Sequence, residues 1–308
     1  MKLKLKLRLR RNKKAKAKQE IWIYKDGEYE QENVVAERLM RLIYDTPVGG
    51  ATLPFLVKRK ALSRLYGIYC RTRHSARKIP KFITKYQVDM TGTSGDYKNF
   101  AEFFSRERDD VIFPEQADVL GSPCDGLASV YTDIDPAMLI AAKGCTFSLG
   151  ELLRDDDLAQ LYRGGTMLRI RLTPAHYHRM HFFDDGTITD SRLIRGDLYS
   201  VSPLAIKRIV RLYCRNKRAL ITFESANFGK VMLVEVGATF VGSIVHCFEN
   251  GDTVSRAQMA SYFLPGGSLL LAFFRQDTFA PDPNLVAQTA QGYETRVMVG
   301  EALGTGRQ

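Results

Sequence analysis

An uninterrupted apolar run follows a glycine turn near the end of this 308-residue chain. The stretch Tyr262–Phe274 reads YFLPGGSLLLAFF, and its last six residues are all apolar. A short apolar run bounded by the Pro265-Gly266-Gly267 turn signal is typical of a buried strand. Ser268 is therefore a hydroxyl at a sharp, accessible turn just before a rigid strand.

The turn before Ser268 suggests a backbone reaction. Glycine lacks a Cβ atom, so this turn can adopt positive φ or strained geometry. That geometry suits attack of the Ser268 hydroxyl on the carbonyl of Gly267, which converts the peptide bond to an ester. Elimination would release the upstream chain, and the remaining dehydroalanine would hydrolyse to a pyruvoyl group. A plain β-turn that carries a serine explains the same letters, and GGS alone does not decide between the two interpretations.

Positive charge is concentrated at the N-terminus. Residues 1–18 contain ten Lys or Arg and no acidic residue, whereas the rest of the chain carries 35 basic and 34 acidic residues. A block of like charge favours disorder, and it acts either as a solubilising tail or by attraction to an anionic phospholipid membrane. No aromatic residues are interleaved with the charges, so no nucleic-acid partner is expected.

The remaining composition fits an intracellular protein. No stretch reaches the roughly 18 apolar residues of a membrane-spanning helix, and no secretory signal is visible. The five cysteines are scattered and odd in number, which fits reduced thiols better than a disulfide framework or a zinc cluster. A peripheral protein on the cytoplasmic face of the cell membrane is expected.

Helical patterns dominate the chain between the basic tail and about residue 110. Apolar residues recur at helical spacing over Glu32–Thr46 and Leu53–Tyr69, and Asn99–Arg106 reads as a short aromatic helix. Basic residues flank the apolar face of the second helix, which suits a membrane surface as well as ordinary packing. We therefore expect a basic tail at residues 1–18 and an N-terminal helical region at residues 19–110.

Short strands and turns follow, so residues 111–308 are expected to form a catalytic β-rich domain. Alternation over Thr166–Leu172 predicts a half-buried strand, and Ser202–Leu212 reads as a helix. Three further strands are expected: Ala219–Phe223, Val231–Val236 and Thr239–His246. The predicted fold class is α+β, with N-terminal membrane-facing helices followed by a mostly antiparallel β core that carries the site.

Three of the five histidines lie within six residues: His176, His178 and His181. In a strand the first two would share one face, unless the chain turns between them. They are candidates for proton transfer, for zinc, or for ordinary hydrogen bonds to backbone; zinc would need a further ligand and a supporting carboxylate. Asp125 either forms an Asp-Gly turn or orients a histidine in a nucleophile–base set with Ser268.

Six short motifs occur in a fixed order along the chain. They are PCDGL at Pro123–Leu127, YHRMH at Tyr177–His181, GDLYSV at Gly196–Val201, EVGATFVGSI at Glu235–Ile244, the YFLPGGS of Tyr262–Ser268, and ETRVMVGEALG at Glu294–Gly304. Together they resemble the phosphatidylserine decarboxylase family of pyruvoyl enzymes. The resemblance runs from the first predicted helix to Gly304 and leaves out mainly the basic tail.

The resemblance implies a zymogen that cleaves itself between Gly267 and Ser268. The β chain would be residues 1–267 and the α chain residues 268–308, held together as a heterodimer; a homo-oligomer of such units is compatible with it. Ser268 would become a pyruvoyl group, the covalent cofactor. Asp125, His181 and Ser268 would form the charge relay for cleavage, and His178 would be a second acid or base; no metal is expected.

For activity, the resemblance implies decarboxylation of phosphatidylserine to phosphatidylethanolamine through a Schiff base with the pyruvoyl group. Histidine suits the proton transfers, because its ordinary pKa lies near 6.5. Some positions depart from the family pattern: His176 stands where Asp is common, Arg256–Ser261 replaces a Lys-Gly-x-Glu-x-Gly pattern, and Leu269 stands where Thr is common.

Three other functions stay open. They are a pyruvoyl decarboxylase of a soluble amino acid, an uncleaved relative that only binds anionic phospholipid, and a zinc enzyme built on the three histidines.

Overall fold

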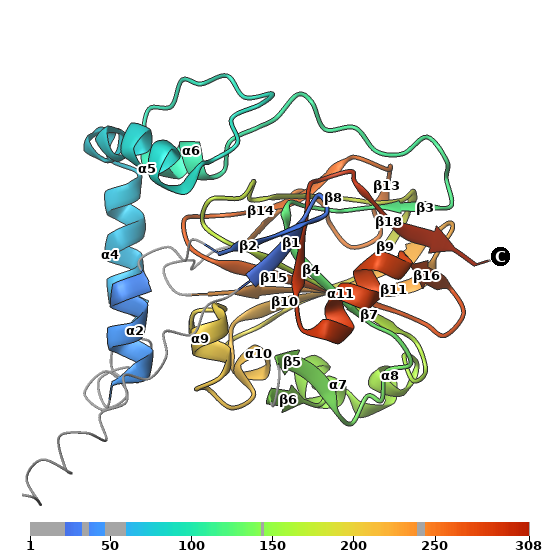
Figure 1. Cartoon of the computed structure of the whole chain (residues 1–308). Helices are drawn as coiled ribbons and strands as arrows, with labels where there is room; N and C mark the ends of the chain where they lie inside the picture. Colours follow the sequence, from blue (N-terminus) through green and yellow to red (C-terminus); the bar gives the residue numbers. More distant parts are fainter. Residues whose placement is uncertain (1–21, 33–36, 47–59, 143–144, 239–243, 308) are drawn as a thin grey trace, which may run out of the picture.

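A ten-stranded sheet forms the centre of the molecule (Figure 1). The computed structural model describes residues 22–32, 37–46, 60–142, 145–238 and 244–307. In spatial order the sheet contains β13 (Thr253–Val254), β9 (Gly186–Ile194), β10 (Arg218–Ser225), β11 (Gly229–Gly237), β15 (Ser268–Phe274), β7 (Thr166–Leu172), β4 (Gly126–Tyr131), β17 (Glu294–Val297), β1 (Trp22–Lys25) and β2 (Glu28–Gln31). The pairings are antiparallel except that of β1 with β17.

Three smaller sheets accompany the large one. Two of them have three strands each: β12 (Ile244–His246), β14 (Met259–Phe263) and β8 (Arg179–His181) in one, and β16 (Phe279–Pro281), β18 (Ala302–Gly306) and β3 (Val119–Gly121) in the other. The last is the pair β5 (Leu139–Ala142) and β6 (Cys145–Phe147). The described part of the chain therefore has the predicted α+β class with a mostly antiparallel core.

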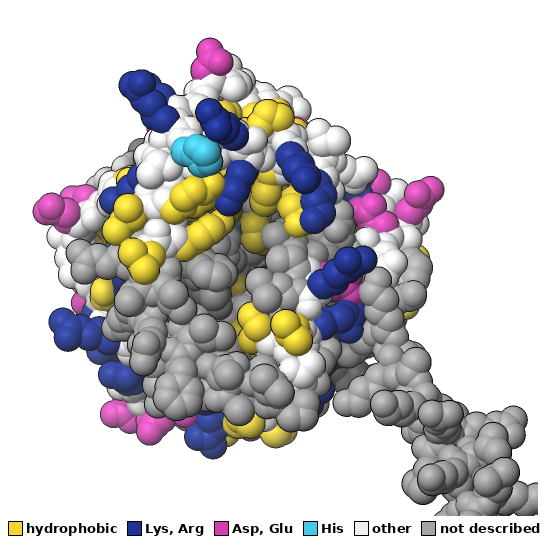
Figure 2. Space-filling model, turned by 90° about the vertical axis from the view of Figure 1, so that its left-hand side faces the viewer, with side chains coloured by type: hydrophobic (Ala, Val, Ile, Leu, Met, Phe, Trp, Pro, Cys, Tyr) yellow, Lys and Arg dark blue, Asp and Glu magenta, His cyan; other side chains and the backbone are white. Residues whose placement is uncertain are grey.

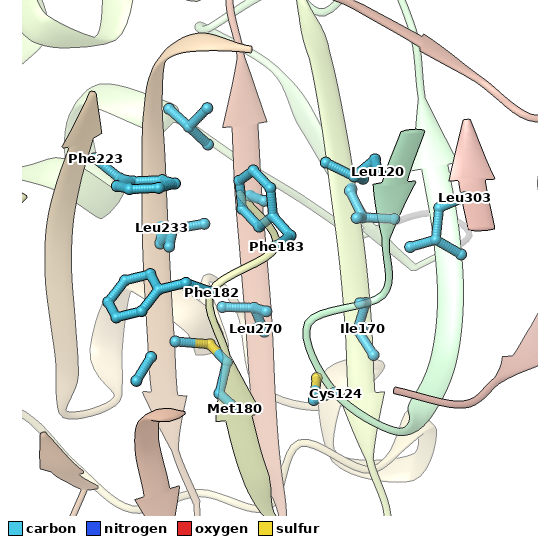
Figure 3. Close-up of a cluster of buried hydrophobic side chains, with 14 of the residues drawn as sticks. Leu120, Cys124, Ile170, Met180, Phe182, Phe183, Phe223, Leu233, Leu270 and Leu303 are labelled. Atoms are coloured by element: carbon cyan, nitrogen blue, oxygen red, sulfur yellow. The ribbon is translucent and has the colours of Figure 1, made fainter. Parts of the chain in front are cut away.

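Strand β15 is buried over its whole length, as the apolar run predicted. Neighbouring side chains of a strand point to opposite faces, so Leu269 and Leu271 pack into one hydrophobic cluster and Leu270 into another. Figure 3 shows the second cluster, in which Leu270 lies near Phe182 and Phe183. Burial of apolar surface on both faces fixes this strand, and Ser268 with it, in the middle of the sheet.

The helices lie outside the sheet. The N-terminal part contains α2 (Glu37–Asp45), α4 (Lys60–Cys70), the 3₁₀ helix η1 (Arg73–Lys78), α5 (Ile79–Tyr86) and α6 (Phe100–Phe104). The later ones are α7 (Leu149–Leu153), α8 (Asp156–Gln160), α9 (Pro203–Ile206), α10 (Leu212–Arg215) and α11 (Pro283–Gln291). None of the helices within the described ranges is long and apolar enough to cross a bilayer. The cysteines are free: Cys70, Cys124, Cys145, Cys214 and Cys247.

Helix positions agree with the predictions better than helix lengths do. Part of the predicted Leu53–Tyr69 helix lies outside the described residues, as does part of the predicted strand Thr239–His246. The predicted helix Ser202–Leu212 is instead two short helices, α9 and α10. Helix α9 ends at Ile206, and Arg211 at the start of α10 has a left-handed φ of 55° that one continuous right-handed helix could not contain.

Two features of the sheet differ from the sequence-based picture. The N-terminal region begins with the β1–β2 hairpin, which was not predicted, rather than with a helix. Strand β7 is buried along its entire length rather than half-buried. Its arginines are tolerated inside because Arg171 pairs with both Glu32 and Glu294, and Arg169 also reaches Glu294.

Candidate active site

Ser268 is the first residue of β15 and is completely buried. It pairs with Gly237 at the end of β11 and with Leu172 at the end of β7. The chain leaving β7 turns through Thr173 and returns to the same place, which brings His178 beside the serine. The Ser268 Oγ lies 3.2 Å from Nδ1 of His178. A nucleophile and a base are therefore within hydrogen-bond reach at the predicted scission point.

The tautomer of His178 is set by its second nitrogen. Nε2 lies 2.9 Å from the carbonyl oxygen of Thr173, which can only accept, so Nε2 carries the proton. Nδ1 is then an acceptor and receives the Ser268 hydroxyl. Burial, with a smaller contribution from the nearby positive charge of Arg106, lowers the pKa of His178 well below its usual value. His178 is thus a neutral imidazole whose Nδ1 lone pair faces the Ser268 hydroxyl.

The ring of His178 is also fixed by packing. The ring of Phe104 stacks on it with centroids 4.0 Å apart, and Phe263 meets it edge-on at 6.4 Å. Phe104 comes from α6, whose N-terminus is capped by the Asn99 side chain. The sequence marked this stretch as a short aromatic helix but gave no sign that it would cover a histidine.

His181 lies on β8 and points to different partners. Its Nδ1 donates to the carbonyl of Ala257 at 2.8 Å, and its Nε2 lies 3.1 Å from the hydroxyl of Tyr177. Burial lowers the pKa of His181 too. Among the described residues no contact joins His181 to Ser268, so the relay predicted through His181 is not assembled in this geometry.

Asp125 is buried one residue before β4 and holds backbone rather than a histidine. Its Oδ1 accepts from the amide of Val299 at 2.9 Å, and its Oδ2 accepts from the amide of Tyr177 at 3.3 Å. Arg108 lies 3.7 Å from Oδ2. Burial raises the pKa of Asp125, and the backbone bonds with the Arg108 charge offset part of that rise. Asp125 therefore anchors the segment that carries His178 but does not touch that ring.

His176 does not share a face with His178, because residues 173–178 form a turn and β8 begins only at Arg179. Its Nδ1 accepts from the amide of Thr173 at 3.0 Å. Burial and the neighbouring arginines lower its pKa to about 3, so it is a neutral structural group. No group of three or more metal-binding side chains occurs in the part of the chain that the structure describes, and the three histidines have separate hydrogen-bond partners there.

The glycine turn before Ser268 uses its two glycines differently. Gly266 has a φ of 153°, which L side chains rarely adopt. At Gly267 an added Cβ would meet nothing closer than 3.6 Å, so space alone does not require glycine there. The positive φ expected for the pair is found at Gly266, one residue before the carbonyl that Ser268 would attack.

A second polar cluster lies beside the site and was not predicted. Glu235 is fully buried on β11 two residues before Gly237, and it accepts hydrogen bonds from Ser261 and, at 2.7 Å, from Nε2 of His246. Side chains two apart on a strand share a face, so Glu235 lies on the Ser268 side of the sheet. The EVGATFVGSI motif contains Glu235, but its letters alone gave the residue no role.

The arrangement as a whole can move a proton from a buried hydroxyl onto a buried neutral imidazole. A family model described as phosphatidylserine decarboxylase matches residues 100–305, the part of the chain that holds all of these groups. The chain belongs to the phosphatidylserine decarboxylase family.

Similar proteins in this family are named as precursors. The phosphatidylserine decarboxylase proenzyme of Clostridium novyi (strain NT) is 40% identical over 286 residues, which cover 91% of this chain and 97% of the relative. That of Ruminiclostridium cellulolyticum is 40% identical over 290 residues, covering 92% and 97%. That of Clostridium perfringens (strain ATCC 13124) is 38% identical over 294 residues, covering 92% and 99%.

Proposed function

We propose that this chain is a phosphatidylserine decarboxylase proenzyme that cleaves itself between Gly267 and Ser268. The observation that carries the proposal is the Ser268 hydroxyl, 3.2 Å from the lone-pair nitrogen of a buried, neutral histidine. The names of its relatives supply the substrate class. The product would be phosphatidylethanolamine, with release of CO₂.

The geometry supports self-cleavage in three steps. His178 accepts the proton of Ser268, whose oxygen attacks the Gly267 carbonyl, and the C–N bond breaks to leave an ester and a free amine. Loss of the Ser268 Cα proton then expels the Gly267 carboxylate and leaves dehydroalanine. Water replaces nitrogen at that residue, releasing ammonia and giving a pyruvoyl group at the new N-terminus. The hydrogen bond from Nε2–H of His178 to the carbonyl oxygen of Thr173 stabilises the imidazolium formed in the first step.

The residues present fit a pyruvoyl group at position 268, because it would occupy the strand position that Ser268 holds beside His178. The group supplies a carbonyl for the substrate amine and an electron sink as CO₂ departs. Decarboxylation also requires a proton at the carbon that loses CO₂. His178 is placed to hold that proton, while Phe104 and the surrounding core exclude water from it.

The geometry supports a division of roles among the candidate residues. His178 is the proton carrier, because it touches Ser268. Asp125 and His181 are positioning residues: the first holds the amide of Tyr177, and the second holds its hydroxyl. They keep the loop around His178 in place, so their loss should slow cleavage through misplacement of that ring.

The two fragments would remain together as a heterodimer. In the uncut chain β15 is paired with β11 on one side and β7 on the other, and scission before Ser268 would leave both pairings in place. Strand β17 from the α fragment is paired with β4 and β1, both from the β fragment. Release of the α fragment would therefore expose a buried strand to water.

We further propose that α2 and α4 meet the cytoplasmic surface of an anionic membrane. Leu42, Leu65 and Ile68 are more than half exposed on these helices. Figure 2 shows hydrophobic side chains beside Lys and Arg on this face. The exposed basic residues of the adjoining segment are Arg71, Arg73, Arg77, Lys78, Lys81 and Lys85. An apolar patch bordered by cations suits an interface with anionic lipid.

A double substitution tests this surface. Leu65→Ser with Ile68→Ser should weaken binding to vesicles containing phosphatidylserine on the order of 10- to 100-fold, since two side chains lose apolar transfer energy. Vesicle sedimentation at low and high salt measures it, and high salt should weaken the parent protein as well. Leu193→Ser, at an exposed strand position, is the matched control. Unchanged binding of the double variant would remove this face from the proposal.

Intact mass spectrometry tests the proposed function. The purified chain should appear as fragments 1–267 and 268–308, the second with a blocked, ketone-bearing terminus. Ser268→Ala should give one full-length chain without decarboxylase activity, while Ser255→Ala, an exposed serine, should be processed normally. A processed Ser268→Ala chain would refute the assignment. A full-length wild-type chain that binds lipid would favour an uncleaved relative that only binds phospholipid. Turnover of a free amino acid would favour a pyruvoyl decarboxylase with a soluble substrate.

A further inference from the structure

Arg106 is a buried cation whose hydrogen-bonding capacity is poorly used. Arg106 is only 3% exposed. It lies two positions after Phe104, whose ring stacks on His178. Its Nε has no hydrogen-bond partner in the described part of the chain. Nη2 makes only long bonds, 3.3 Å to the carbonyl of Asp89 and 3.5 Å to that of Ala175. A buried charged donor without a partner is costly, so it calls for an explanation.

No carboxylate of the described residues lies within 4.0 Å of Arg106. The nearby acids are engaged elsewhere: Asp110 makes a two-pronged contact with Arg108, and Asp89 and Asp125 each lie 3.7 Å from the same guanidinium. Burial lowers the pKa of Arg106, with only partial compensation from the more distant charge of Asp125. Arg106 therefore has room in its electrostatic environment for an anion.

Arg106 also belongs to the reaction site by position. Its Nη2 contacts Ala175 in the same turn whose Thr173 carbonyl fixes the tautomer of His178. Ser268 and His178 are as deeply buried as Arg106. An opening that admits a substrate to the serine position therefore leads to the neighbourhood of this guanidinium.

We propose that Arg106 binds the phosphodiester of the substrate headgroup and thereby selects a phosphorylated serine over a free amino acid. This inference rests on the proposed function for the identity of the substrate. Guanidinium donors match phosphate oxygens in geometry, and the unpartnered Nε supplies a donor that the protein itself does not satisfy. The carboxylate of the headgroup is a poorer occupant, since a cation on it would stabilise the form that must lose CO₂.

Binding to the full-length Ser268→Ala chain tests the proposal without relying on turnover. Calorimetric titrations would use glycerophosphoserine, glycerophosphoethanolamine, inorganic phosphate and L-serine. Both phosphodiesters should bind, and Arg106→Gln should weaken them about 10- to 100-fold, the usual value of a charge-assisted hydrogen bond. L-Serine should bind weakly and equally to both chains. Arg195→Gln, an exposed arginine, is the matched control.

Each outcome bears on the inference. Equal phosphodiester affinity in Arg106→Gln and its parent would overturn it, as would a loss confined to L-serine, which would place the carboxylate there. Tight binding of inorganic phosphate alone would indicate a free-phosphate site rather than a headgroup site. If Arg106→Gln does not fold, the test is made on the Ser268→Ala parent by thermal unfolding. The inference then requires that glycerophosphoethanolamine raise the melting temperature of the parent and that ethanolamine and L-serine do not.

The same measurements separate this inference from the proposed function. A wild-type chain that is never cleaved, yet binds phosphodiesters through Arg106, would refute the decarboxylase and keep the anion site. A cleaved and active enzyme with Arg106-independent headgroup binding would do the reverse. In the active enzyme, Arg106→Gln should lower kcat/KM for short-chain phosphatidylserine about 10- to 100-fold, while Arg106→Lys should restore part of it.

Discussion

Acid should destabilise this protein through its buried neutral histidines. The folded-state pKa of His178 lies well below the ordinary value, that of His176 is about 3, and that of His181 is lowered as well, in each case mainly by burial. In the unfolded chain histidine titrates near 6.5. Below that pH the unfolded state binds more protons than the folded state, so the free energy of unfolding falls as the pH falls.

The size of the effect follows from the linkage relation. At pH 5.5, one unit below the unfolded value, each histidine that stays neutral when folded costs about 1.4 kcal/mol. His176 and His178 together should therefore remove about 3 kcal/mol between pH 7.5 and 5.5, and His181 adds to this. Carboxyl groups with lowered pKa, such as that of Glu294, act only at lower pH. Asp125 acts in the opposite direction, because its pKa is raised.

Urea unfolding of the uncleaved Ser268→Ala chain, followed by circular dichroism at pH 7.5, 6.5 and 5.5, measures this loss. Comparison with His178→Gln isolates one histidine, since the opposing contribution of Asp125 is common to both chains. The difference in free energy of unfolding between pH 7.5 and 5.5 should be smaller by about 1.4 kcal/mol in the variant. Ser255→Ala, at an exposed position without a titratable group, should leave it unchanged. An equal pH dependence in His178→Gln and its parent would show that His178 is not neutral inside.

Two further substitutions test the structure around the scission point, both in the Ser268→Ala background. Gly266→Ala should cost about 1–3 kcal/mol of stability because of its positive φ, whereas Gly267→Ala should cost less, as thermal unfolding would show. Equal costs would place the strain elsewhere. Glu294→Gln should cost about 3–5 kcal/mol, since it leaves buried arginines without a full counter-charge, while Asp277→Asn in an exposed pair should stay within about 1 kcal/mol. A mild effect of Glu294→Gln would mean that solvent reaches the pair.

The sequence was most informative where local signals were complete. The apolar run after Pro265-Gly266-Gly267 contained everything needed to predict a buried strand, and β15 covers that run but begins one residue earlier, at Ser268. The alternation in Thr166–Leu172 was misleading about exposure, because the partners that let Arg171 be buried, Glu32 and Glu294, are far away along the chain. Burial of a charged residue depends on such distant partners, which periodicity does not reveal.

The site shows the same limit. Proximity in sequence identified the histidine stretch, but the turn after Thr173, not strand alternation, decides which ring faces Ser268. Likewise Asp125 could be recognised as a candidate, yet its attachment to the amides of Tyr177 and Val299 depends on strands that meet only in the folded sheet. Side-chain chemistry was readable from the letters, whereas the pairing of those side chains required the tertiary structure.

The interleaving of β15 and β17 with strands from the upstream segment affects whether cleaved molecules can exchange fragments. On the proposed scission, each short fragment would stay with the long fragment from which it was cut, because leaving requires opening the large sheet at two separate places. If two cleaved variants were mixed, their fragments would not be exchanged between molecules. A defect in one half could be rescued only by a partner present during folding, never by one added afterwards.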